Sequence, residues 1–188
     1  MRRLTVAGVV GLGLLLSAGA LALVLASDHE EDPIFRATAF LIMAWSFIGA
    51  GIVAWMRRPD NQFGQLMTAV GMTVFLGALG AANDSIPFTL GYTFGGIFIA
   101  VFIHALLAFP RGYLETRLVY GIVTTAYLIL TVGSLLTAFF DDVADDCAQC
   151  RANAFLLVAC TTAVAAINEV LIVVGLPALA ASLFVFWR

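Results

Sequence analysis

Six apolar runs, separated by short charged stretches, are the feature that most limits what this chain can fold into. A helix needs about 20 mostly apolar residues to cross the hydrocarbon core of a bilayer. Only 11% of the residues are charged, whereas soluble domains carry about 25%, so the chain could not cover its surface in water. We therefore expect an all-α integral membrane protein, a six-helix bundle that forms a single domain over residues 1–188. The expected spans are residues 4–26, 37–56, 63–82, 92–109, 118–140 and 170–187.

The last apolar stretch, residues 154–187, is too long for one ordinary span, and Asn168 and Glu169 interrupt it. We expect residues 170–187 to form the sixth span and residues 154–167 to form an interfacial or re-entrant segment. The alternative is one long, tilted helix.

At the other end of the chain, residues 1–27 have an alternative interpretation as a cleaved signal peptide. The apolar core of such a peptide is usually about 7–15 residues long, and the run from residue 4 to residue 26 is longer than that. We therefore expect this run to be retained as the first span.

Arginines and acids alternate between successive loops. Seven arginines and two acids lie in residues 1–3, 57–62, 110–117 and 188. Two arginines and nine acids lie in residues 27–36, 83–91 and 141–153. Because short cytoplasmic loops carry the excess of basic residues, both termini are expected in the cytoplasm, with the protein in the cell membrane. The arginines expected to anchor the inner interface at lipid headgroups are Arg57, Arg58, Arg111 and Arg117.

Small residues recur at helical spacing within the spans. The pattern is seen at Gly91 and Gly95, at Gly77 and Gly80, and in the second span at residues 49–51. Glycine at such positions lets helix backbones approach closely in lipid. The pattern predicts a compact bundle and carries no function by itself.

A Cys-x-x-Cys pair, Cys147 and Cys150, lies in the third expected outer loop. Disulfides persist in oxidising compartments outside the cytoplasm, so our first interpretation is a local disulfide. A reducible redox sensor is one alternative. Another is half of a metal site, since closed zinc sites take four ligands and the remaining ones would come from Asp145, Asp146 or His29.

His104 and Glu169 are the ionisable side chains expected within or beside the spans. For His104 we favour a helix-to-helix hydrogen bond; the functional alternatives are a haem ligand, a proton relay or a pH switch. Glu169 is expected at the outer interface, where Arg36 or Arg151 could pair with it. Deeper burial would make Glu169 a functional candidate, because an ionised group at the midplane costs about 2.5–3.5 kcal/mol. Cys160 is expected to be an inert packed thiol.

Catalytic signatures are missing from the sequence. It contains no G-x-x-x-x-G-K-[ST], H-E-x-x-H or G-x-S-x-G motif, and the expected inner loops are too short to hold an active site. We expect no enzymatic activity in this chain, no cofactor, no firm metal site and no nucleic-acid partner, because no basic stripe is present.

Two expected inner loops carry a resemblance. One span ends in Arg-Arg-Pro-x-Asn-x-x-Gly at residues 57–64, and another ends in His-x-Leu-Leu-Ala-Phe-Pro-x-Gly-x-Leu at residues 104–114. With the outer Cys-x-x-Cys-x-x-Asn of residues 147–153, these motifs resemble the N-terminal six-helix membrane region of actinobacterial sensor histidine kinases. The resemblance covers nearly the whole chain.

The resemblance implies a membrane-embedded sensory or anchoring module that passes an envelope or membrane signal to a cytoplasmic output domain. It also implies a homodimer formed through that cytoplasmic region, in addition to contact with the lipid bilayer. A kinase of this group continues into a phosphoacceptor helix pair and an ATP-binding domain, and this sequence ends at Arg188. We therefore expect a fragment or a stand-alone membrane protein, and no kinase residue is carried over. The alternative function is a small transporter or channel, or a thiol-active membrane protein.

Overall fold

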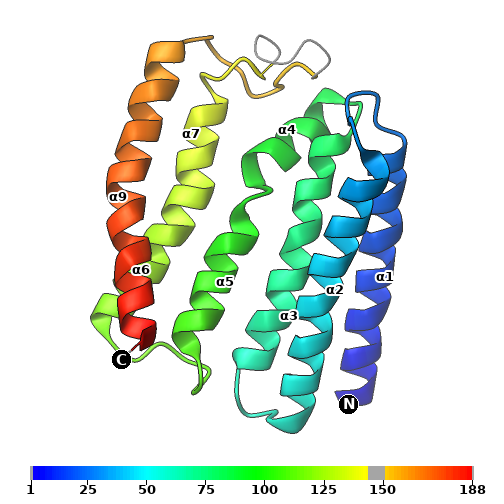
Figure 1. Cartoon of the computed structure of the whole chain (residues 1–188), viewed down its shortest axis with the longest axis vertical. Coiled ribbons are helices and arrows are strands. Elements are labelled where there is room, and N and C mark those ends of the chain that lie inside the picture. Colours follow the sequence, from blue (N-terminus) through cyan, green and yellow to red (C-terminus); the bar gives the residue numbers. More distant parts are fainter. Residues whose placement is uncertain (1, 144–150, 188) are drawn as a thin grey trace.

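The computed structural model describes residues 2–143 and 151–187, and every element within them is a helix (Figure 1). The first four elements are α1 (Arg2–Leu25), α2 (Pro33–Arg57), α3 (Phe63–Val74) and the 3-10 helix η1 (Phe75–Ala81). They are followed by α4 (Ser85–Phe94), α5 (Ile97–Ala108) and α6 (Arg117–Leu128). The last are the π-helical turn η2 (Ile129–Gly133), α7 (Ser134–Ala138) and α9 (Thr161–Trp187).

Several elements join end to end into longer helical columns. Five helical segments of the described chain are long and apolar enough to cross a membrane: Leu4–Leu25, Pro33–Arg57, Phe63–Ala81, Ser85–Ala108 and Arg117–Ala138. The 27 residues of α9 correspond to a length of about 40 Å, compared with a hydrocarbon core of about 30 Å. The expected all-helical architecture with membrane-length segments is thus confirmed.

The columns run up and down the bundle, so α1 begins and α9 ends at the same end (Figure 1). At the opposite end lie the α1–α2, η1–α4 and α7–α9 connections. We call this opposite end the acidic end, because its described part contains Asp28, Glu30, Glu31, Asp32, Asp84, Asp141 and Asp142. We call the other end the arginine end; it contains Arg57, Arg58, Arg111 and Arg117.

The fourth span begins earlier than the sequence analysis expected. Helix α4 starts at Ser85, seven residues before the expected start at Tyr92. Residues 83–91 were expected to form an outer loop. In the structure Pro87 lies in the first turn of α4, where a proline loses no hydrogen bond because the first amides of a helix have no partner within it. The column is interrupted instead at Gly95 and Gly96, between α4 and α5.

The expected division of the last apolar stretch at Asn168 and Glu169 is wrong. Helix α9 runs without a break from Thr161 to Trp187, through both polar residues and through Pro177. Asn168 and Glu169 are exposed on the helix surface, where a polar side chain need not interrupt the backbone hydrogen bonds. The structure is closer to the alternative of one long helix, which begins at Thr161 rather than at residue 154.

Glycines bring α2 and α3 into backbone contact. A Cβ on Gly64 would lie 2.3 Å from the amide nitrogen of Trp55, and one on Gly51 would lie 2.5 Å from that of Thr68. No atom lies within 4 Å of the corresponding position on Gly49. Of the two glycines noted in the second span, only Gly51 therefore serves close packing.

The second pair of glycine patterns forms the contact between η1 and α4. A Cβ on Gly91 would lie 2.0 Å from the amide nitrogen of Gly80, and one on Gly95 would lie 3.0 Å from the Cα of Gly77. The expected close approach at these positions is confirmed. It matters for function because the same backbone forms one wall of the pocket described next.

Candidate functional site

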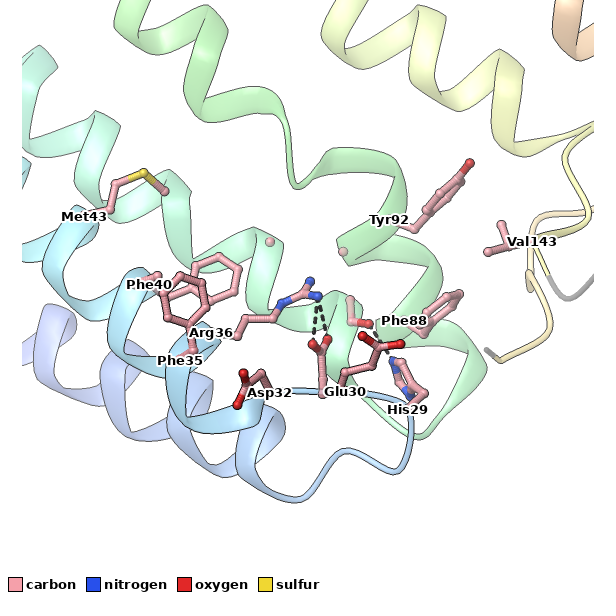
Figure 2. A pocket seen from close by; sticks show the side chains of 15 residues that line it. His29, Glu30, Asp32, Phe35, Arg36, Phe40, Met43, Phe88, Tyr92 and Val143 are labelled. Atoms are coloured by element: carbon pink, nitrogen blue, oxygen red, sulfur yellow. Dashed lines mark hydrogen bonds and ion pairs between the residues drawn. The ribbon is translucent and has the colours of Figure 1, made fainter. Parts of the chain in front are cut away.

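A cavity of about 810 Å³ opens at the acidic end between α2, η1 and α4, beside the α1–α2 loop (Figure 2). Its ionisable lining residues are His29, Glu30, Glu31, Asp32 and Arg36. Its aromatic and apolar lining residues are Phe35, Ala39, Phe40, Met43, Phe88, Tyr92 and Val143. Three glycines, Gly77, Gly80 and Gly91, complete the wall. We call this cavity the acidic-end pocket.

His29 fixes the α1–α2 loop against the wall of the pocket. Its Nε2 lies 3.1 Å from the carbonyl oxygen of Gly80, and its Nδ1 lies 3.2 Å from the hydroxyl oxygen of Ser27. The edge of its ring meets Phe88, with ring centroids 5.6 Å apart. Because both ring nitrogens make polar contacts within the protein, His29 holds the α1–α2 loop against η1.

Glu30 and Arg36 form an ion pair within the pocket. One guanidinium nitrogen of Arg36 lies 2.7 Å from Oε1 and 2.9 Å from Oε2 of Glu30. The Glu30 side chain is only 8% exposed, so it would be costly to leave it without this partner. The Arg36 guanidinium also lies 5.7 Å from the ring centroid of Phe40. The pair thus uses the only described positive charge that lines the pocket.

The far wall is aromatic and leads to the α7–α9 connection. The rings of Phe88 and Tyr92 are stacked with centroids 6.4 Å apart. The Tyr92 hydroxyl donates a hydrogen bond to the carboxylate of Asp141. A residue that lines the pocket is therefore bonded directly to the segment that follows α7.

Further bonds tie the residues that precede α9 to the same end of the bundle. Arg151 lies 3.0 Å from a carboxylate oxygen of Asp28, which joins this segment to the α1–α2 loop. The Asn153 side-chain amide donates to the carbonyl oxygens of Ala138 and Asp141, at 2.6 and 2.9 Å. The amide of Ala154 donates to the Thr89 hydroxyl at 2.8 Å. The α1–α2 loop, α4 and the α7–α9 connection thus form one bonded layer at the acidic end.

The cysteine pair expected as a disulfide, Cys147 and Cys150, lies outside the described residues. In the sequence, the described residues that flank this stretch are Val143, which lines the pocket, and Arg151, which pairs with Asp28. No group of three His, Cys, Asp or Glu side chains with the geometry of a metal site occurs in residues 2–143 and 151–187. His29, which we considered as a ligand completing such a site, is instead bonded to Ser27 and Gly80.

His104 and Glu169 are not brought together. Nδ1 of His104 in α5 lies 3.5 Å from the Tyr127 hydroxyl in α6, and the two rings meet edge to face. This contact matches the helix-to-helix interpretation of His104. Glu169 lies on the exposed surface of α9, in its third turn, and neither Arg36 nor Arg151 pairs with it, since each binds an acid of the α1–α2 loop.

The four arginines expected as anchors are exposed at the arginine end. Arg111 forms an ion pair with Glu115. At the same end, a side chain joins the two loops that carry the motifs of residues 57–64 and 104–114. The Asn61 side chain donates to the Pro110 carbonyl at 2.7 Å and accepts from the Phe63 amide at 2.8 Å. We call this contact the Asn61 junction. Gly112, with φ +85°, passes so close to Asn61 that a Cβ would overlap it.

The Asn61 junction can be tested by mutation. Asn61→Ala is expected to destabilise the chain by about 1–2 kcal/mol, because two hydrogen bonds at the surface are lost and each contributes about 0.5–1.5 kcal/mol net. The measurement is thermal unfolding of the purified chain in detergent, and the matched control is Asp60→Ala, a change at the exposed neighbouring position. Equal unfolding temperatures for the two variants would show that the junction does not hold the loops together.

The acidic-end pocket was not predicted from the sequence. The acids between Asp28 and Asp32 were counted as charges of an outer loop, and His29 was considered only as a metal ligand. The signal that could have drawn attention to it was the pair Phe35 and Arg36, about one helical turn after Asp32, followed by Phe40 about one turn further on. Comparisons of the chain with models of protein families, with curated proteins and with solved structures found no match to any of them.

Proposed function

We propose that this chain is a membrane-embedded sensory or anchoring module, which passes a condition at its acidic end to an output domain on the cytoplasmic side. The observation that carries the proposal is the bonded layer at the acidic end. Through Tyr92 and Asp141, and through Asp28 and Arg151, it joins the pocket to the residues that lead into α9. The resemblance to the membrane region of sensor histidine kinases supports the same function.

The orientation supports a signal that travels from outside to inside. In this proposal the arginine end faces the cytoplasm, because basic residues are retained there, and the acidic end faces the cell exterior. Helix α9 then runs from the bonded layer to the cytoplasmic side (Figure 1). A change at one end of a continuous helix reaches its other end as a shift or rotation of that helix.

The packing of α9 suits such a movement. A Cβ on Gly133 would lie 2.6 Å from a methyl carbon of Leu171, so the π-helical turn receives a side chain of α9. One turn further along, Gly175 faces Ile129. Both contacts join a glycine to an aliphatic side chain. In this proposal α9 has two arrangements, which differ by a shift or rotation. A ligand or a strain at the acidic end changes their populations only if it interacts differently with each arrangement.

The alternative of a transporter is less well supported. Transporters place their substrate and ion sites near the bilayer midplane, whereas the pocket lies at one end of the bundle. The buried polar residues of the described spans are Ser17, Thr68, Thr89 and Thr93, and none is ionisable. Solute flux through the purified chain in liposomes would favour the transporter over the sensor.

The sensory proposal predicts that the ion pair between Asp28 and Arg151 sets the output. The chain would be fused after Arg188 to a histidine-kinase core, in several helical registers, and autophosphorylation would be measured in vesicles. Arg151→Gln and Asp28→Asn should each shift the activity several-fold, and a double variant with the two charges exchanged should restore it. The pair is exposed and contributes at most about 1 kcal/mol to stability, so the variants should fold normally.

The matched control is Asp84→Asn, which removes an exposed acid of the same end that caps no helix amide. Its activity should equal that of the unmodified fusion. If all variants in every register have the same activity, the chain does not transmit through this layer, and it is better described as a plain membrane anchor.

A further inference from the structure

We infer that the acidic-end pocket binds an amphiphile with a cationic ammonium head and an apolar tail. The inference rests on the proposed function, since it names the chemical class of the signal that the acidic end would receive. It is carried by three properties of the lining: its uncompensated negative charge, its aromatic side chains and its change from charged to apolar along α2.

The charge of the lining favours a cation. Three carboxylates and one guanidinium line the pocket, and the guanidinium of Arg36 is already paired with Glu30. This leaves the carboxylates of Glu31 and Asp32, neither of which forms an ion pair with a described residue. An anion would face both carboxylates and would have to displace Glu30 from Arg36. A bare metal ion is disfavoured because the described acids do not converge on one point.

The aromatic lining favours an organic ammonium over an inorganic cation. Phe35, Phe40, Phe88 and Tyr92 all line the pocket (Figure 2). Ring faces attract ammonium groups, and aromatic walls combined with negative charge are the usual recognition site for quaternary ammonium ligands. The pocket already holds one such contact within the chain, that of Arg36 with Phe40 at 5.7 Å.

The course of α2 explains the apolar tail. From Arg36 the pocket follows the helix past Ala39 and Phe40 to Met43, a distance of about 10 Å along the axis. The lining is charged at the loop and apolar at the Met43 end, which lies within a membrane-length segment. A volume of about 810 Å³ lies within the range of about 300–1,000 Å³ that is common for small-molecule sites. Head and tail of one amphiphile match these two regions.

An alkylammonium group has two natural sources, a lipid with an amine headgroup and a water-soluble alkylamine. The first experimental arm uses the full chain in nanodiscs of phosphatidylglycerol, which has no amine, and titrates octyltrimethylammonium by calorimetry against empty nanodiscs. Octanol and octanoate are the neutral and anionic controls. The second arm releases the chain from nanodiscs of mixed phosphatidylethanolamine and phosphatidylglycerol into a native mass spectrometer and identifies the retained lipid.

The expected result is saturable binding of octyltrimethylammonium, weakened about tenfold when Glu31→Gln and Asp32→Asn are combined. Both side chains are exposed, so the amide variants keep the fold, and Asp84→Asn should bind like the unmodified chain. Retention of phosphatidylethanolamine that depends on Glu31 and Asp32 would identify a lipid as the source, and its absence alongside octyltrimethylammonium binding would identify a soluble amine.

The inference is overturned if octanol or octanoate binds as tightly as the ammonium compound. It is also overturned if the combined variant binds it as well as Asp84→Asn does. These measurements do not involve an output domain. Binding without any change in the kinase fusion would therefore count against the proposed function alone, and a kinase response without ammonium binding would count against the inference alone.

Discussion

Gly91→Ala is expected to destabilise the chain by about 3 kcal/mol or more. Adding a methylene to a packed core costs about 1–3 kcal/mol when side chains can move aside. Here the added carbon would lie 2.0 Å from the amide nitrogen of Gly80 and 2.5 Å from the carbonyl carbon of Leu79. Both are backbone atoms, so η1 and α4 would have to separate. The measurement is the unfolding free energy of the purified chain, from titration of mixed micelles with a denaturing detergent.

The matched control is Gly121→Ala, at an exposed position in α6 where no atom lies within 4 Å of the added carbon. Its stability should not fall, and the higher helix propensity of alanine should raise it by up to about 1 kcal/mol. Because Gly80 and Gly91 also line the acidic-end pocket, separating the two helices should abolish ligand binding as well. If Gly91→Ala unfolds like Gly121→Ala, the close contact between η1 and α4 does not exist in the membrane.

Most of the fold could be predicted because the bilayer imposes a length and a composition on each span. Deviations arose where local geometry overrides hydropathy. Residues 83–91 were expected to form a loop, although α4 begins at Ser85 and Pro87 lies in its first turn, where proline is tolerated. Asn168 and Glu169 were taken as an interruption, although exposed polar residues do not break a helix. Hydropathy gives the apolar content of a segment and does not locate its ends.

The site could be predicted less well, for a different reason. The pocket brings together residues that are far apart in the chain, such as Arg36 and Tyr92, and no local spacing indicates such a meeting. The bonds from Asp28 to Arg151 and from Asn61 to Pro110 also join residues that are remote in sequence. By contrast, the glycine patterns were informative, because a glycine reports a close approach whichever segment makes it.

The proposed orientation of the bundle leads to an all-or-none prediction. The four exposed arginines of the arginine end should lie at anionic cytoplasmic headgroups. Each arginine there contributes about 1 kcal/mol of electrostatic attraction to the membrane surface. Single cysteines placed at Asp60 and at Glu115 should therefore be shielded from a membrane-impermeant thiol reagent in intact cells. A cysteine placed at Glu31, in the α1–α2 loop, should be labelled. The background chain would carry Cys147→Ser, Cys150→Ser and Cys160→Ser, so that only the introduced thiol reacts.

Permeabilised cells provide the control for this measurement, because all three introduced cysteines should then be labelled. Asp60 and Glu31 are both exposed in the structure, so a difference between them in intact cells reports the side of the membrane and not burial within the protein. Labelling at position 60 from outside, together with protection at position 31, would show that the bundle has the opposite orientation in the membrane. The acidic-end pocket would then face the cytoplasm, where it could not receive an extracellular ammonium compound, and a signal passing from outside to inside through α9 would be excluded.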